Sequence, residues 1–207
     1  MSGFLVAVIM LLMSMTAMAK SPLIVVLGDS ISAGYGIEVD QGWVVLLQDK
    51  LMQSGSHYSI RNESISGDTS AGGLARIDRI LAEHKPAVVL VELGANDGLR
   101  GLSPALMKSN LAEIIHRARQ AGAKPLLLGM KIPPNYGKRY VDLFYNIYPQ
   151  LSKELDIPYV PFILEDVALN KDLMQADGLH ANAKAQPFIA DKIASYLFPL
   201  LNTESDR

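Results

Sequence analysis

Two polar blocks at opposite ends of the sequence carry side-chain types that can act together in nucleophilic chemistry. Ser30 lies in "GDSISAGYG", directly after the apolar run "LIVVL", and Asp177 and His180 lie in "DGLHAN". A serine hydroxyl needs an adjacent base to attack at neutral pH; histidine is the usual base, and a carboxylate orients the imidazole. We therefore expect Ser30 to be a nucleophile, His180 its base and Asp177 the partner of His180.

Two further blocks supply candidates for stabilising a negatively charged intermediate. Gly67 lies in "ESISGDTSAGG" and Asn96 in "GANDG". The tetrahedral intermediate of acyl transfer needs hydrogen-bond donors aimed at its oxyanion. The backbone N–H groups of Ser30 and Gly67 and the side-chain amide of Asn96 are suited to that role. Each residue alone is an ordinary turn or cap residue; their combination favours catalysis.

Several other kinds of active site are disfavoured. The sequence has no cysteine, which removes thiolate nucleophiles and thiolate zinc sites, and it has no G-x-S-x-G, S-x-x-K, H-E-x-x-H, Walker A or G-x-G-x-x-G motif. Asp29, Asp68 and Asp97 each follow an apolar run, yet a carboxylate cage for a metal is a weak alternative, and Asp29 is expected to brace the turn. We expect no metal and no cofactor.

The elements that must position these residues alternate between apolar and amphipathic stretches. Strands are expected over 23–27, 58–62, 87–93, 125–130 and 158–162. Helices are expected over 42–53, 70–84, 103–121, 139–155 and 184–200. This alternation predicts an α/β fold, a three-layer α/β/α sandwich around a mostly parallel five-stranded sheet. Ligands bind at the carboxyl ends of such strands, and the candidate residues lie just after the ends of strands.

The N-terminus has the pattern of an export signal. An apolar core is followed by small residues and Ala17-Met18-Ala19, the A-x-A pattern of a secretory cleavage site. We expect a signal peptide over 1–19, cleavage after Ala19, and a single domain over 20–207 in the periplasm or outside the cell. A short N-terminal membrane anchor is the alternative; after processing no stable membrane span is expected.

The net charge of −2 argues against nucleic-acid binding.

The quoted blocks together resemble the SGNH (GDSL) hydrolase family. Its four letters correspond to Ser30, Gly67, Asn96 and His180, and the match spans nearly the whole processed chain; Ile31 departs from the leucine that usually follows GDS. The resemblance implies a flavodoxin-like fold, a Ser30–His180–Asp177 triad and the oxyanion hole named above. Similarity to a periplasmic branch of the family implies a broad range of acyl thioester, aryl and alkyl ester and lysophospholipid substrates.

The same resemblance directs attention to the loop "KIPPNYGKRY" (131–140) after the fourth strand. It implies that Ile132, Pro133, Pro134 and Tyr136 bind the acyl chain of a small-molecule ester or thioester. Lys138 and Arg139 either meet a phosphate or face solvent. We expect a monomer. Two alternatives stay open: a carbohydrate O-acetylesterase with the same machinery, and a non-catalytic binding module on the same fold.

Overall fold

The structure is a computed structural model that describes residues 21–202. The expected signal peptide and its cleavage site lie outside the described residues.

A five-stranded parallel sheet forms the centre of the molecule, as expected from the sequence. The strands are β1 (Leu23–Gly28), β2 (Ser59–Asn62), β3 (Val88–Glu92), β4 (Lys124–Leu128) and β5 (Tyr159–Val160). Their order across the sheet is β2-β1-β3-β4-β5, and every neighbouring pair runs parallel. The central strands β1 and β3 are apolar almost throughout because helices cover both faces of the sheet.

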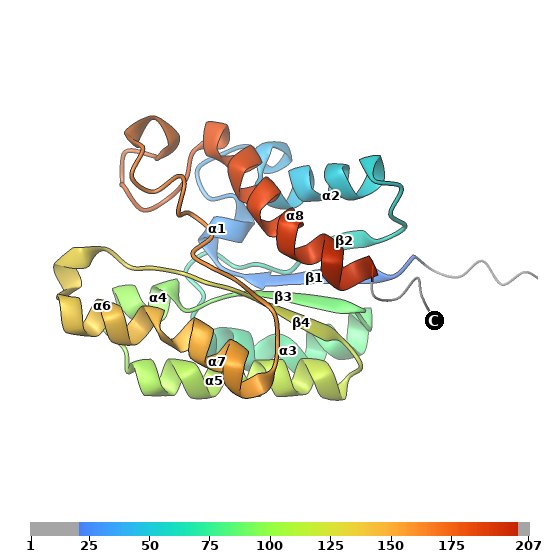
Figure 1. Ribbon diagram of the computed structural model, residues 1–207, viewed down its shortest axis with the longest axis horizontal. Coiled ribbons are helices and arrows are strands. Elements are labelled where there is room, and N and C mark those ends of the chain that lie inside the picture. The colour runs from blue at the N-terminus through green and yellow to red at the C-terminus, as the bar shows by residue number, and fades with distance from the viewer. Residues whose placement is uncertain (1–20, 203–207) are drawn as a thin grey trace, which may run out of the picture.

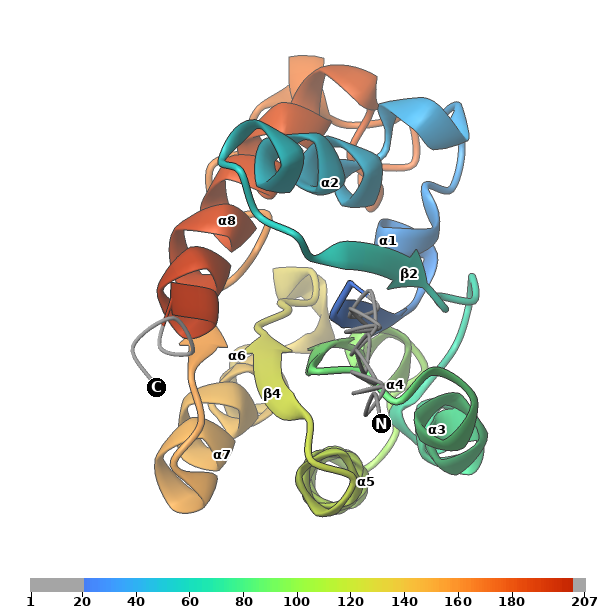
Figure 2. The same cartoon turned by 90° about the vertical axis from the view of Figure 1, so that its right-hand side faces the viewer.

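Five helices cover the two faces of the sheet (Figures 1 and 2). Helices α2 (Trp43–Gln53) and α8 (Gln186–Asn202) lie side by side on one face. Helices α3 (Ser70–His84), α5 (Pro104–Gln120) and α7 (Ile147–Leu155) lie on the other. This is the three-layer sandwich that the alternation of strands and helices predicted. No helix within residues 21–202 is long and apolar enough to cross a membrane.

The helix expected over 139–155 is divided into two. Helix α6 (Lys138–Tyr145) ends before Asn146, and α7 begins at Ile147. The cause is Pro149, which has no N–H to donate to the carbonyl of Tyr145 four residues earlier. The break lets α6 continue from the loop 131–140 while α7 packs against the sheet (Figure 1).

Short helical turns at the carboxyl edge of the sheet were not predicted from the sequence. Helix α1 (Ser30–Ala33) follows β1 directly, and α4 (Ala95–Leu99) follows β3. Turns of 3-10 helix occupy η1 (Val39–Gln41), η2 (Pro134–Tyr136), η3 (Lys171–Leu173) and η4 (Ala183–Ala185). Such turns are too short to show the periodicity by which longer helices are found. They carry Ser30, Asn96, Pro134 and Tyr136 among the candidate residues.

Candidate active site

The turn after β1 holds Ser30 at the first position of α1. Asp29 is the N-cap of this helix, and its side chain accepts a hydrogen bond from the backbone N–H of Ile31 at 3.0 Å. Gly34 ends the helix in the left-handed conformation, and its N–H donates to the carbonyl of Ser30. Asp29 therefore braces the turn, as expected from the sequence, and presents Ser30 at the carboxyl edge of the sheet.

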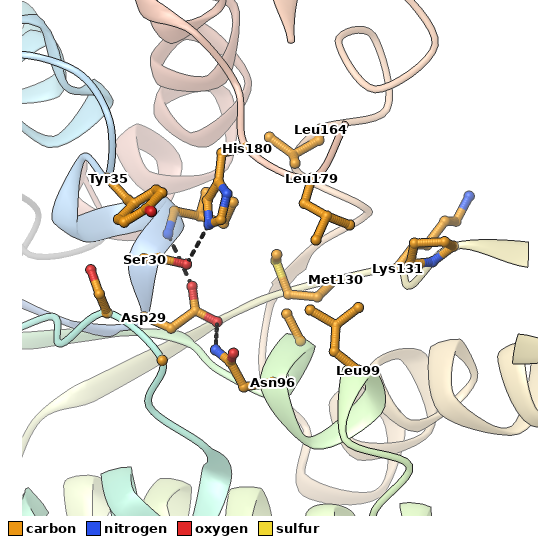
Figure 3. Close-up of a pocket in the computed structure, with 15 residues that line it drawn as sticks. Asp29, Ser30, Tyr35, Asn96, Leu99, Met130, Lys131, Leu164, Leu179 and His180 are labelled. Atoms are coloured by element: carbon orange, nitrogen blue, oxygen red, sulfur yellow. Dashed lines mark hydrogen bonds between the residues drawn. The ribbon is translucent and has the colours of Figure 1, made fainter. Parts of the chain in front are cut away.

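The structure brings together the three residues expected to form a triad (Figure 3). His180 Nε2 lies 2.8 Å from Ser30 Oγ, although the residues are 150 positions apart in the chain. His180 Nδ1 lies 2.6 Å from Asp177 Oδ2. A base thus contacts the hydroxyl on one side of the imidazole, and a carboxylate holds the other side.

Asp177 is held in its ionised form by local hydrogen bonds. Its Oδ1 accepts the backbone N–H groups of Leu179 at 2.9 Å and His180 at 3.0 Å. Desolvation alone would raise the pKa of Asp177, but these bonds and the His180 ring outweigh it and lower the pKa to about 2. The carboxylate is therefore suited to orient the imidazole and to stabilise its protonated form.

The three residues expected to supply the oxyanion donors, Ser30, Gly67 and Asn96, line one cavity. Within residues 21–202 the backbone N–H groups of Ser30 and Gly67 donate to no protein acceptor. Gly67 has a φ of 80°, in the left-handed region where glycine is favoured. Asn96 Nδ2 donates to Asp29 Oδ2 at 2.9 Å, which leaves its second hydrogen for a ligand.

A buried acid lies beneath this turn and was not singled out from the sequence. Glu92, the last residue of β3, is fully buried, and its Oε2 accepts from Asp29 N at 3.1 Å and Ser32 Oγ at 2.6 Å. Burial raises the pKa of Asp29 to about 6 and the pKa of Glu92 well above its usual range. The signal in the sequence was a carboxyl inside the run "AVVLVEL", where both faces of the strand are covered.

The three aspartates weighed as a metal cage have separate partners. Asp29 caps α1, and Asp68 forms an ion pair with Arg76 at 2.8 Å. Asp97 is buried and accepts the backbone N–H of Ser70 at 2.8 Å. Each of the three carboxylates therefore has its own protein partner.

An apolar cavity of about 380 Å³ extends from Ser30 and His180. Leu99, Met130, Leu164 and Leu179 line its far side, opposite the polar residues (Figure 3). A second cavity of about 280 Å³ shares Lys131, Pro133, Leu164 and Leu179 with the first and continues to Leu169 and Met174. The arrangement offers a long apolar surface that begins at the serine hydroxyl.

The residues expected to bind an acyl chain are divided between these cavities. Pro133 lines both, while Ile132 and Pro134 line only the second. Tyr136 lines neither, because its hydroxyl donates to the carbonyl of Leu99 at 2.8 Å and ties the loop to α4. Lys138 is exposed and pairs with Asp142 one helical turn away.

Tyr35 is a cavity residue that sequence reasoning missed. Its ring centroid lies 4.7 Å from that of His180, and just over half of its surface is exposed. Gln175 Nε2 donates to the carbonyl of Tyr35 at 2.7 Å and joins its loop to the loop of His180. Contacts between segments so far apart leave no local pattern in the sequence.

Comparison with known proteins gives a consistent result. Residues 26–186 match the sequence model of the GDSL-like lipase/acylhydrolase family. The chain is 49% identical over 190 residues to "Esterase TesA" of Pseudomonas aeruginosa, covering 92% of this chain and 94% of that protein. It is 48% identical over 187 residues to "Thioesterase 1/protease 1/lysophospholipase L1" of Escherichia coli K12, covering 90% and 88% of the two chains.

The fold also matches a solved structure of an esterase. The psychrotrophic esterase EstA from Pseudoalteromonas, inhibited by monoethylphosphonate, superposes with a TM-score of 0.83 at 43% sequence identity. The match covers 87% of this chain and 98% of that one.

Proposed function

The chain belongs to the GDSL-like lipase/acylhydrolase family and is a hydrolase that acts on ester bonds; we propose that it does so through an acyl intermediate on Ser30. The observation that carries this proposal is the 2.8 Å contact between Ser30 Oγ and His180 Nε2. Asp177 on the other side of the imidazole completes a triad. The substrates are carboxylic esters and acyl thioesters, including aryl esters, acyl-CoA and lysophospholipids.

The reaction proceeds in two steps. His180 accepts the proton of Ser30 as Oγ attacks the carbonyl carbon, and the oxyanion is stabilised by the Ser30 and Gly67 N–H groups and the Asn96 amide. His180 then gives the proton to the departing alkoxide or thiolate. In the second step His180 takes a proton from the water that attacks the acyl-serine, and returns it to Ser30 Oγ as the C–Oγ bond breaks and the acid is released. Asp177 remains a carboxylate throughout.

The apolar cavity favours an acyl chain over a small acetyl group. Leu99, Met130, Leu164 and Leu179 offer no hydrogen bonds to the hydroxyl groups of a sugar, whereas they bury methylene groups favourably. This lining supports a lipid esterase or thioesterase over a carbohydrate O-acetylesterase. Pro133, Ile132 and Pro134 would contact the distal part of the chain. Tyr136 would position the loop rather than touch the substrate.

The expected leader places the substrates outside the cytoplasm. A chain processed after Ala19 would act as a monomeric periplasmic or secreted enzyme. There it would meet lysophospholipids and exogenous esters, while bulk acyl-CoA would remain on the other side of the inner membrane.

The decisive experiment is labelling with a small fluorophosphonate, read as intact mass. Wild type should gain one adduct, and Ser30→Ala should gain none and lose esterase turnover by about a thousandfold or more. Ser66→Ala removes another hydroxyl that lines the same cavity and should keep the adduct.

Near-full esterase activity in Ser30→Ala would overturn the assignment of the nucleophile. Folded wild type that takes up no label and shows no turnover would instead support a binding module.

A further inference from the structure

Glu92 is a titratable group at the active site that the two reaction steps do not use. It lies at the carboxyl end of the central strand β3, opposite Gly28 of β1 in the register of the sheet. Its side chain is completely buried, directly below the turn that carries Ser30. An ionised carboxylate in such a place needs hydrogen-bond donors for both of its oxygens.

The contacts of Glu92 are those of an uncharged acid. Oε2 accepts the backbone N–H of Asp29 and the hydroxyl of Ser32. Oε1 has no hydrogen-bond partner among the described residues. An ionised carboxylate with a bare, buried oxygen would be costly, whereas a protonated oxygen carries no full charge to solvate.

The fit between β1 and Glu92 is close. A Cβ on Gly28 would lie 2.7 Å from Glu92 Oε2, so only glycine lets this carboxyl reach the Asp29 N–H.

Few groups near Asp29 and Glu92 could compensate a second negative charge. Asp29, the N-cap of α1, is the acid that acts on Glu92. Tyr148 lies near both carboxyls and brings no positive charge, and His180 acts on Asp29. Arg76 donates to the carbonyls of Gly28 and Glu63 and is paired with Asp68, so its charge is already compensated.

Of the two adjacent carboxyls, Asp29 has the contacts of the charged one. It accepts N–H groups from Ile31 and Asn96, and its hydrogen bonding with Glu92 lowers its pKa further. Two neighbouring carboxyls share a site best when one keeps its proton. Glu92, whose Oε1 has no donor beside it while both oxygens of Asp29 accept N–H groups, is the group that keeps it; burial accordingly raises the pKa of Glu92 well above its usual range.

We propose that Glu92 is a positioning residue that works as an uncharged carboxylic acid. It holds the Asp29–Ser30 turn from below and keeps Asp29 anionic, so that Asp29 in turn holds the Asn96 amide toward the oxyanion. This inference rests on the proposed function, since it concerns the placement of Ser30 and Asn96.

The direct test is infrared spectroscopy of the whole protein at neutral pH, which does not depend on activity. Wild type should show the carbonyl stretching band of a protonated carboxyl that is absent from Glu92→Gln. The matched control is Glu165→Gln, because Glu165 is an exposed carboxylate paired with Lys192 and should contribute no such band. If Glu92→Gln leaves the band region unchanged, Glu92 is ionised and the proposal is overturned, whatever the fate of the Ser30 assignment.

Kinetics provide the second test. Glu92→Gln keeps an oxygen that accepts from Asp29 and Ser32, and glutamine is uncharged like a protonated Glu92. This variant should therefore retain kcat within about threefold. The midpoint of the acidic limb of kcat/KM should also stay in place. Glu92→Ala should lower kcat by about tenfold or more with little change in KM. A shifted acidic limb in Glu92→Gln would mean that a negative charge had been removed, which contradicts the proposal. If Glu92→Ala does not fold, Glu92→Gln and the infrared band still decide.

Discussion

At the scale of single residues, the site depends on two carboxyls whose pKa values are shifted in opposite directions. Asp177 is stabilised as an anion by N–H groups, and its pKa is lowered to about 2. Asp29 lies in a buried turn, and its pKa is raised to about 6. Asp177 therefore stays ionised at neutral pH, whereas Asp29 is expected to take up a proton as the pH falls toward 6.

The raised pKa values of Asp29 and Glu92 predict how stability depends on pH. Between the ordinary carboxyl pKa and the raised one, the folded state binds more protons than the unfolded state. Stability therefore falls as the pH rises through this range, by up to about 1.4 kcal/mol per pH unit for one such group. Glu92→Gln removes one titrating group, so its free energy of unfolding should fall less than that of wild type between pH 5 and pH 8. Urea denaturation at the two pH values measures both slopes; equal slopes would contradict a raised pKa for Glu92.

At the scale of elements, the long strands and helices could be predicted and the short turns could not. Continuous runs such as Ile24–Leu27 mark strands buried on both faces, and Ser103 with Pro104 marks the start of α5. The break at Asn146 was missed because the apolar residues of 139–155 continue at helical spacing past Pro149, although a proline inside a helix interrupts it.

The candidate site was predictable in part for a related reason. Ser30, Gly67, Asn96 and His180 lie just after the carboxyl ends of strands or in nearby loops, and a parallel sheet brings such residues to one edge. The contact of Tyr35 with His180 and that of Gln175 with Tyr35 depend on how two loops fold over that edge. No spacing in the sequence encodes such a contact.

The packing of α2 against α8 gives a prediction about stability. Helix α2 begins at Gly42 without a side-chain cap, and the N–H of Trp43 instead donates to Gln186 Oε1 at 3.0 Å. Gln186 is buried, so Gln186→Leu leaves a buried N–H unpaired and should lower the free energy of unfolding by about 1–3 kcal/mol in urea denaturation.

The control joins the same two helices. Lys50 on α2 pairs with Asp191 on α8 at the surface, and Lys50→Ala should cost less than about 1 kcal/mol because exposed ion pairs contribute little. Equal losses in the two variants would show that Gln186 does not cap α2.

At the scale of the whole molecule, a single sheet and its core hold the candidate active site at the carboxyl edge of the strands. The buried apolar residues of β1, β3 and β4 belong to this core, and Ser30, Gly67, Asn96 and His180 line one cavity. In such an arrangement the sheet fixes the positions of the catalytic groups. The loops at its edge can then differ in sequence and change which substrate is bound.

The signal peptide expected over 1–19 gives a prediction at this scale. The protein expressed with residues 1–207 in a bacterial host should be recovered from the periplasm or medium with an intact mass that begins at Lys20. A protein of full mass that fractionates with the membrane would favour the short N-terminal anchor instead. A chain beginning at Lys20 serves as the mass standard.

Both ends of the described chain lie at the amino edge of the sheet. The carbonyl of Pro22 accepts from Ser59 at the start of β2, and Lys124 at the start of β4 donates to the carbonyl of Leu200 near the end of α8. Figure 1 shows these ends on the side away from α1 and α4. A bead, a linker or a fusion partner attached at either end would therefore leave the cavity facing outward, and the enzyme can be immobilised from both ends without obstructing its substrates.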